Sequence, residues 1–253
     1  MHNPLTLRME QFTSFTDPER RRLDELISGR SETYAPRQTI LPEGEKVKDI
    51  HLVTSGLAAR SKMLPDGERQ IMAFLVPGDL CDVEVFVLEA MDHDIVAISE
   101  TTCALVPAKV IEDLLTEFSK LTKALWWSTM TDSAVLRERI IDHGRRDARE
   151  RLAHLFYEML IRYRIVLETT DDTFPFPVTQ DELADATGLT PVHVNRMLQQ
   201  LRSEGLIEFK NKTLCVLDPA RLKKVARFEA NYLHLNRTEQ RTGEVSGRAG
   251  DLV

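Results

Sequence analysis

The chain has 253 residues, of which 42% are hydrophobic and 29% are charged, and this balance is typical of a globular protein with two packed domains. No apolar run approaches the roughly 18 to 20 residues of a membrane-spanning helix, and the N-terminus lacks a secretory signal pattern, so we expect a cytoplasmic protein without a membrane partner. The net charge of −7 divides into −8 for residues 1–143 and +1 for residues 144–253, which permits a nucleic-acid partner for the second part.

Residues 1–34 predict a short helical lead-in, in which Asp17-Pro18 supplies the cap and the first turn. From about Arg37 the sequence changes to short β-prone runs separated by turn signals: Ile50–Val53, Leu57–Met63, Ile71–Val76, Ile95–Ile98 and Cys103–Val106. Glycines that suit turns with positive φ recur along them at nearly regular spacing, at Gly44, Gly56, Gly67 and Gly78. The pattern predicts a small antiparallel β-roll.

Residues Lys109–His143 predict one long helix, since no proline or glycine interrupts them. Its apolar residues are too many for a single stripe: Leu121, Leu125, Trp126, Trp127, Met130, Val135, Leu136, Ile140 and Ile141. Such a helix needs two partners, which we expect to be its own roll and a second copy of itself. A homodimer follows, and the alternative is a helix buried within one monomer.

Gly144 precedes the basic pair Arg145-Arg146, and we expect a hinge there. Arg149–Leu167 then predicts an amphipathic helix, and Glu168–Pro177, rich in Thr, Asp and Pro, predicts a loop. Beyond Leu235 the polar composition predicts a disordered tail. The expected domains are residues 1–143, with a dimerisation helix at about 109–143, then residues 144–235, and a tail at 236–253.

The most informative motif of the chain is TQDELADATGLTPVHVNRMLQQ, which begins at Thr179. Thr179 and Glu182 form a T-x-x-E capping box that begins one helix, and Thr190-Pro191 begins a second. Gly188 permits the tight turn between the two helices. This order predicts a helix-turn-helix, and the alternative is an ordinary helical hairpin without a nucleic-acid partner.

Residues 206–217 predict a two-stranded wing beside the second helix, with a tight turn at Asn211-Lys212. Lys210 and Lys212 lie at its tip, where a cation suits phosphate contact. A final helix is predicted from Asp218-Pro219 to about Tyr232. Wing and helices together predict a winged helix-turn-helix.

The first turns of the second helix carry the candidate base-reading residues, because that end of a recognition helix enters the major groove. Arg196 can donate two hydrogen bonds to a guanine edge, and Asn195 or His193 can reach a base or a phosphate. The alternatives are a surface salt bridge for Arg196 and plain solvent exposure for His193. We expect the backbone of double-stranded DNA to be contacted by Thr179, Gln180, Thr190, Lys210 and Lys212.

With these motifs the sequence resembles the Crp/Fnr (cyclic AMP receptor protein/FNR) family of bacterial transcription regulators over about residues 20–230. The resemblance is strongest in TQDELADATGLTPVHVNRMLQQLRSEGLI and is weaker but collinear in the roll. It implies an α+β fold: an N-terminal cyclic-nucleotide-binding-type β-roll (jelly-roll), a long dimerisation helix and a C-terminal winged helix-turn-helix. It also implies a homodimer on a pseudo-palindromic DNA site, contact with RNA polymerase, and no enzymatic activity.

The sequence departs from the family pattern at two places. Family members usually carry a glutamate that reads a cytosine where this chain has Val192, which cannot accept that hydrogen bond but can contact a thymine methyl group. In nucleotide-binding members, a glutamate, an arginine and a hydroxyl residue follow the Gly-Asp pair, whereas here Gly78-Asp79 is followed by Asp82-Val83 and His93-Asp94. A cyclic phosphate would meet two carboxylates, so we do not expect cyclic AMP as the effector.

No cofactor is predicted. No cysteine precedes Cys81, so a four-thiolate iron–sulfur site is not expected, and Cys81 and Cys103 are interpreted as inert buried thiols. His51 and His93 are the candidate haem ligands, but a lone histidine is more often structural. Two other interpretations are a cupin-like ligand-binding or enzymatic barrel, for which no His/His/Glu grouping exists, and a constitutive regulator whose roll only supports the dimer.

Overall fold

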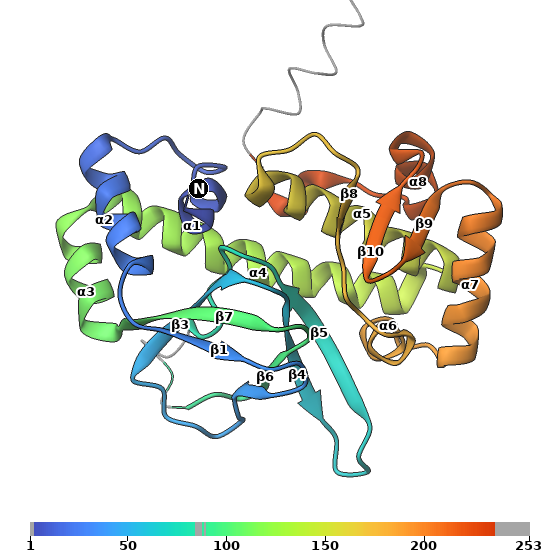
Figure 1. Ribbon diagram of the computed structural model, residues 1–253, viewed down its shortest axis with the longest axis horizontal. Helices are drawn as coiled ribbons and strands as arrows, with labels where there is room; N and C mark the ends of the chain where they lie inside the picture. Colours follow the sequence, from blue (N-terminus) through green and yellow to red (C-terminus); the bar gives the residue numbers. More distant parts are fainter. Residues whose placement is uncertain (1–2, 84–87, 89, 236–253) are drawn as a thin grey trace, which may run out of the picture.

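The computed structural model describes residues 3–83, 88 and 90–235. Two N-terminal helices, α1 (Pro4–Met9) and α2 (Asp17–Ile27), precede a β-roll, and a helical centre connects the roll to a second unit of helices and short strands (Figure 1). The long helix α4 (Ser119–Arg145) crosses the middle of the molecule. No helix in this part of the chain is long and apolar enough to cross a membrane.

The roll consists of two antiparallel sheets with the strand orders β1–β7–β3 and β2–β6–β4–β5, which confirms the predicted β-roll. Its strands are β1 (Ser31–Tyr34), β2 (Thr39–Leu41), β3 (Asp49–Ser55), β4 (Ala58–Met63), β5 (Arg69–Leu75), β6 (Asp94–Ala97) and β7 (Thr101–Pro107). The sequence does not predict β1 and β2, because both are short and β1 exposes three of its four side chains.

The four glycines that space the roll all have positive φ, between 84° and 92°, as the sequence predicts. The requirement for glycine is strictest at Gly56 and Gly78. A Cβ atom would lie 2.2 Å from the backbone oxygen of Glu100 at the first position and 2.5 Å from that of Pro4 at the second. These two turns need both the left-handed backbone and the missing side chain.

The prediction of one continuous helix over Lys109–His143 is wrong. The chain forms two helices, α3 (Ala108–Glu117) and α4, separated by Phe118, which is extended with φ −124° and ψ 99°. The break allows α3 to fold back against α4 and β7 instead of continuing straight. The hydroxyl of Thr122 stabilises the bend, because it donates to the carbonyl oxygen of Leu115 at 2.6 Å.

The cap of α2 is Thr16 and not Asp17, which is the first residue of the helix. Glu19 accepts the backbone N–H of Thr16 at 2.7 Å and completes a capping box. Asp17-Pro18 is by itself a common start of a helix, so the sequence favours a cap one residue later than the real one.

The predicted hinge at Gly144 is also wrong, since α4 continues through it to Arg145. The chain turns at Arg146, which has ψ 140°, and α5 (Ala148–Leu167) begins directly afterwards. The carboxylate of Asp147 determines the position of this turn, because it accepts the free backbone N–H groups of Arg149 and Glu150 in the first turn of α5 at 2.9 and 2.8 Å.

The second unit is the predicted winged helix-turn-helix. It contains α5, α6 (Gln180–Thr187), α7 (Pro191–Ser203), β8 (Thr173–Pro175), β9 (Ile207–Lys210), β10 (Thr213–Val216), α8 (Pro219–Ala226) and a 3₁₀ helix at Ala230–Leu233.

The predicted loop Glu168–Pro177 contains β8, which pairs with β10 because Phe174 and Phe176 alternate into the core. The final helix ends before Tyr232, since Arg227 adopts the left-handed conformation with φ 48°. The predicted tail lies outside the described residues.

The two units share the largest apolar core of the described chain, which includes residues of β4, β5, α4, α5, the helix-turn-helix and the wing. Phe74 of the roll packs edge-to-face against Phe176, with ring centroids 5.5 Å apart. Two ion pairs join the same parts, from Arg162 to Asp79 and from Arg69 to Asp185. The helix-turn-helix therefore lies directly against the roll of its own chain.

Candidate nucleic-acid interface

The first helix of the motif, α6, begins at the predicted capping box. The hydroxyl of Thr179 accepts the backbone N–H of Glu182 at 3.2 Å, and the carboxylate of Glu182 accepts the backbone N–H of Thr179 at 2.7 Å. Thr179 and Gln180 are both exposed at this end of the helix. Free helix N–H groups and the helix dipole favour an anion here.

The turn between the two helices is the one that the glycine predicts. Gly188 has φ 63° and ψ 36°, and its N–H closes α6 on the carbonyl oxygen of Ala184. Thr190 then caps α7, because its hydroxyl accepts the backbone N–H of His193 at 3.2 Å, and Pro191 occupies the first position, where no N–H is needed.

Helix α7 has one buried face and one face open to solvent. The buried face consists of Val194, Met197, Leu198 and Leu201, which are at most 8% exposed. Val192 on the other face is 82% exposed, which is unusual for a large apolar side chain and is not explained by packing within the described chain. Figure 1 shows α7 at the edge of the molecule, at the opposite end from α2 and α3.

The four predicted residues of α7 differ in exposure. Val192 and Arg196 are exposed, whereas His193 and Asn195 are half-buried. Among residues 3–83, 88 and 90–235, no hydrogen bond or ion pair is found for the guanidinium of Arg196. The surface salt bridge that was the alternative interpretation of Arg196 is therefore not present within this part of the chain.

Gln199 is a further candidate that the sequence interpretation missed. It lies seven residues after Val192 and three after Arg196, so all three project from the same side of α7, and all are exposed. The helical spacing alone could have identified it. A glutamine amide can donate to and accept from an adenine edge, so it has the chemistry of a base reader.

The wing is held by an Asn211-Lys212 turn in which both residues have positive φ, 51° and 60°. Lys210 is paired with Glu208 of the same strand at 2.5 Å, and this contact raises the pKa of the lysine. Lys212 is exposed and has no ion pair among the described residues. Of the two lysines at the tip, only the charge of Lys210 is paired with another described residue.

Known proteins match both units of the chain. Residues 31–118 match the family described as cyclic nucleotide-binding domain, and residues 150–225 match the Crp-like helix-turn-helix domain. The chain is 28% identical to the transcriptional activator protein FnrL of Cereibacter sphaeroides, over 77% of this chain and 79% of that protein. It is 27% identical to the nitrogen fixation regulation protein FixK of Bradyrhizobium diazoefficiens, over 78% of this chain and 82% of that protein. This chain also aligns with the structure of FixK2 from Bradyrhizobium japonicum, with a TM-score of 0.71 and 26% sequence identity. The alignment covers 79% of this chain and 98% of the FixK2 chain.

The chain belongs to the Crp/Fnr family. It is a DNA-binding transcription regulator, as its helix-turn-helix, its relatives and its structural neighbour agree. The predicted family and fold are confirmed, and the cupin-like interpretation is not favoured.

The roll of this Crp/Fnr regulator places carboxylates at the positions that the sequence comparison with nucleotide-binding members identified. Asp82 is fully buried and accepts from the backbone N–H of His51 at 2.9 Å and contacts its ring Nδ1 at 2.8 Å. Asp94 accepts the backbone N–H of Glu43 at 2.8 Å. These carboxylates hold loops of the roll together.

The cysteines of the regulator are free thiols. Cys81 and Cys103 are both fully buried, and a hydrogen bond between them together with burial raises the pKa of the Cys81 thiol. A buried thiol that stays protonated is a poor nucleophile, which agrees with the interpretation of the pair as inert. Within the described residues, no group of three or more His, Cys, Asp or Glu side chains is placed to hold a metal ion.

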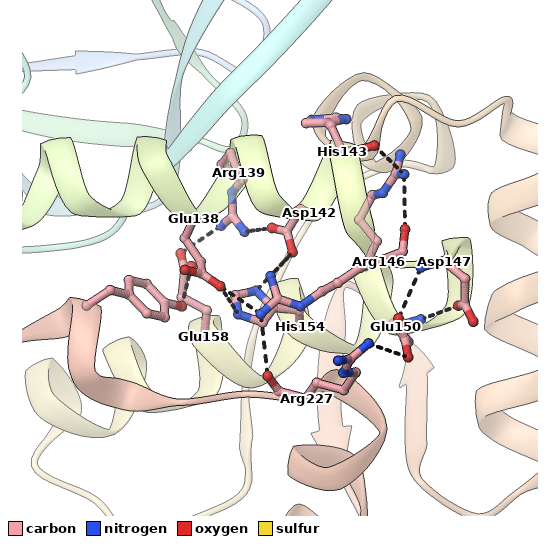
Figure 2. Close-up of polar contacts among 12 residues, drawn as sticks. Glu138, Arg139, Asp142, His143, Arg146, Asp147, Glu150, His154, Glu158 and Arg227 are labelled. Carbon is pink, nitrogen blue, oxygen red and sulfur yellow. Dashed lines mark hydrogen bonds and ion pairs between the residues drawn. The ribbon is translucent and has the colours of Figure 1, made fainter.

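A buried polar cluster joins the end of α4 to the start of the DNA-binding unit (Figure 2). Arg139 of α4 pairs with Asp142 at 2.9 Å and with Glu158 of α5 at 2.8 Å. Arg146 pairs with Glu138 at 2.7 Å and with Asp142 at 2.8 Å. The hydroxyl of Tyr232 donates to Glu158 at 2.8 Å. We call these six residues and His154, which lies among them, the junction cluster.

His154 contributes an imidazole ring to the junction cluster. Its side chain is fully buried beside the rings of Phe228 and Tyr232, and neither ring nitrogen has a hydrogen-bond partner among the described residues. Its nitrogens lie 3.6 Å from Glu138 and 3.5 Å from Asp142. Burial, together with the charges of Arg139 and Arg146, lowers the pKa of His154 to about 2.

We expect His154 to make the regulator less stable in mild acid. The unfolded chain takes up a proton near pH 6.5 and the folded chain does not, so stability is complete above that pH and falls as the pH decreases. Between pH 6.5 and 5 the free energy of unfolding should decrease by about 2 kcal/mol from this group. Urea unfolding at a fixed protein concentration across this range measures it.

The variant His154→Phe keeps an aromatic ring and cannot be protonated, so its stability should decrease less steeply over the same range. The exposed His234→Gln provides the control and should follow the wild type. A wild type that gains stability on acidification relative to His154→Phe would show that Glu138 and Asp142 dominate over burial, contrary to this prediction.

Proposed function

We propose that the regulator binds a pseudo-palindromic duplex site as a homodimer, with residues 1–143 as the roll and dimerisation unit and residues 144–235 as the DNA-binding unit. In this proposal the recognition helix α7 reads base edges and the flanking elements contact phosphates. The base-reading residues are Arg196, Asn195, His193 and Val192, and the backbone is contacted by Thr190, Thr179, Gln180, Lys210 and Lys212.

The observation that carries the homodimer is an apolar stripe on α4 that nothing covers within the described chain. Trp126 is 67% exposed, Met130 50%, Leu136 39%, Ile140 72% and Ile141 45%. The opposite side of the helix packs on the roll and on α5. A second copy of the same helix is the partner that buries such a stripe, and a two-fold axis along α4 pairs it with itself.

The exposed face of α7 supports the base-reading roles. Arg196 offers two parallel N–H groups that match the O6 and N7 acceptors of guanine, and its charge is not paired within the described residues. Val192, which at 82% is the most exposed large apolar side chain among the described residues, suits the methyl group of a thymine. We therefore propose a half-site related to that of other family members, with an altered base preference at the position facing Val192.

The proposal does not include cyclic AMP as an effector, and the positions of Asp82 and Asp94 support this. Both carboxylates stabilise the roll by accepting backbone N–H groups, and neither could bind a phosphate without repulsion. We also propose contact with RNA polymerase, because the relative FnrL is named a transcriptional activator. A protein with these partners acts in the cytoplasm.

Selection of bound duplexes from a random pool tests the proposed function directly. We expect the recovered sequences to contain two inverted half-sites about one helical turn apart. The size of the complex, measured by sedimentation, should correspond to two chains for each duplex. Recovery of single unrepeated sites, or of no common sequence at low salt, would contradict the proposal.

Lys212→Ala should weaken binding to every duplex by a similar factor. A lysine on a phosphate contributes charge without reading sequence, so the slope of log affinity against log salt should decrease by about 0.9 for each subunit. Fluorescence anisotropy with the selected site and with an unrelated duplex, at several salt concentrations, measures both effects.

Lys46→Ala removes the same charge from an exposed position on the roll and is the matched control. It should leave the salt slope unchanged. If Lys212→Ala instead weakens only the selected site, Lys212 contributes to base recognition and the phosphate role is wrong.

A further inference from the structure

Three segments of the chain end beside the start of α5. They are the last turn of α4, the link at Arg146 and the last turn of α6 at Thr187. The final carbonyl groups of a helix have no partner within the helix and need donors from elsewhere. The donors that these ends use therefore determine how α4 and the helix-turn-helix are joined.

Arg151 supplies those donors to all three segments. One terminal nitrogen of its guanidinium donates to the carbonyl oxygen of Thr187. The other donates to the carbonyl oxygens of His143 and Arg146, each at 3.3 Å. A guanidinium can hold several acceptors in one rigid arrangement, which a lysine ammonium on its flexible stem cannot do in the same way.

Two further contacts bring the same elements together. The ring of His143 in α4 lies against the turn of the helix-turn-helix, since a Cβ atom at Gly188 would be 2.9 Å from its Nδ1. Arg149 donates to both carboxylate oxygens of Glu204 at the end of α7, one of these contacts being 3.1 Å from Nε to Oε1. Arg149 and Arg151, both in the first turns of α5, therefore hold the C-terminal ends of α7 and α6.

The junction cluster, which lies beside this joint, is a rigid part of the molecule. Figure 2 shows the junction cluster between α4 and α5, with Arg139, Asp142, Arg146 and His154 pointing toward one another. Asp142, His154 and Glu158 are at most 1% exposed. An ion network whose central groups are buried resists small changes of angle, because each of these groups would lose its partner in a medium of low polarity.

We infer that Arg151 is a positioning residue that fixes the angle between the dimerisation helix α4 and the helix-turn-helix, and thereby the half-site spacing that the dimer accepts. This inference rests on the proposed two-fold binding. Each base pair added between the half-sites increases their separation by about 3.4 Å and rotates one half-site relative to the other by about 35° around the DNA axis. A dimer with a rigid joint therefore tolerates few spacings. A loosened joint tolerates several.

The test uses the site recovered by selection, with its central spacer changed by −1, 0, +1 and +2 base pairs, and a duplex with one half-site. The full-length wild type should bind the natural spacing at least about tenfold more tightly than the others. The variant Arg151→Gln should bind all four spacings within about threefold of one another. Its affinity for the single half-site should stay within about twofold of the wild type, because the base-reading face is unchanged.

Three further variants make the result specific. Arg151→Lys should lie between the wild type and Arg151→Gln, because one ammonium cannot reach all three carbonyl groups in the same geometry. His143→Ala loosens the joint from the α4 side at an exposed residue, and should relax the spacing preference in the same direction. Lys224→Gln removes one charge from an exposed position of α8 and should keep the wild-type preference.

Circular dichroism and sedimentation establish first that each variant is folded and dimeric, and His143→Ala decides the question if Arg151→Gln does not fold. An unchanged spacing preference in the folded variants would overturn the inference. So would an equal loss of affinity on the single half-site and on the full site, since Arg151 would then act inside the DNA-binding unit. A wild type that binds all four spacings equally well would also overturn the inference. A wild type that binds the full site no more tightly than the single half-site would instead refute the proposed two-fold binding.

Discussion

Arg196→Ala should reduce affinity for the selected site by at least about 30-fold and leave affinity for unrelated DNA nearly unchanged. Each bidentate contact between arginine and guanine contributes about 1–3 kcal/mol of discrimination, and a dimer makes two of them. The guanidinium is exposed and unpaired within the described residues, so its loss should not disturb the fold. Anisotropy titrations with both duplexes at one salt concentration measure the ratio.

The exposed Arg21→Ala on α2 removes the same charge far from α7 and should not change that ratio. A duplex in which inosine replaces the contacted guanine keeps O6 and N7 and should still bind tightly, whereas adenine at that position should reproduce the loss seen with Arg196→Ala. Equal weakening on selected and unrelated DNA would show that Arg196 contacts phosphate and not a base.

The second large effect is expected at the apolar stripe of α4. Ile140→Asp should convert the dimer to a folded monomer, because Ile140 is 72% exposed within one chain and the proposed two-fold contact brings two copies together. Loss of two buried side chains and burial of two carboxylates together oppose association by at least about 4 kcal/mol, or roughly a thousandfold in the dissociation constant. Sedimentation velocity over a range of concentrations measures it.

Binding to the full site should then decrease to the level of a single half-site, since the two recognition helices are no longer linked. Leu64→Asp changes another exposed apolar residue, on the β4–β5 hairpin, and should remain dimeric with full affinity. If Ile140→Asp stays a dimer in sedimentation, the two chains associate through a different surface and the arrangement proposed for α4 is wrong.

The sequence predicts a structural feature well when the interactions that form the feature lie within a few residues of one another. The capping box at Thr179, the turn at Gly188 and the cap at Thr190 are each formed within four residues, and the structure has all three where the sequence places them. The break at Phe118 has no such local signal, because it depends on α3 packing back against α4 and the roll. The sequence does not predict β8 for the same reason, since this strand forms by pairing with β10, about forty residues later in the chain.

The residues of the candidate site also differ in whether local sequence patterns or contacts between distant segments decide their positions. The periodicity of α7 predicts that Val192 and Arg196 point outward, and the same count would have added Gln199. The role of Arg151 could not be predicted, because its acceptor at Thr187 lies 36 residues away and is a backbone oxygen without any side-chain signature. Nor does the sequence distinguish Lys210, which pairs with Glu208, from Lys212.

By itself, then, the sequence determined the family, the two kinds of unit and the residues that α7 presents to solvent, because caps, turns and helical periodicity act over a few residues. Only the tertiary structure decided where the long helix divides, how the helix-turn-helix rests against its own roll, and which arginines join it to α4. Those features depend on contacts between segments far apart in the chain, where burial removes water as a competing partner and gives a hydrogen bond or an ion pair its directing strength.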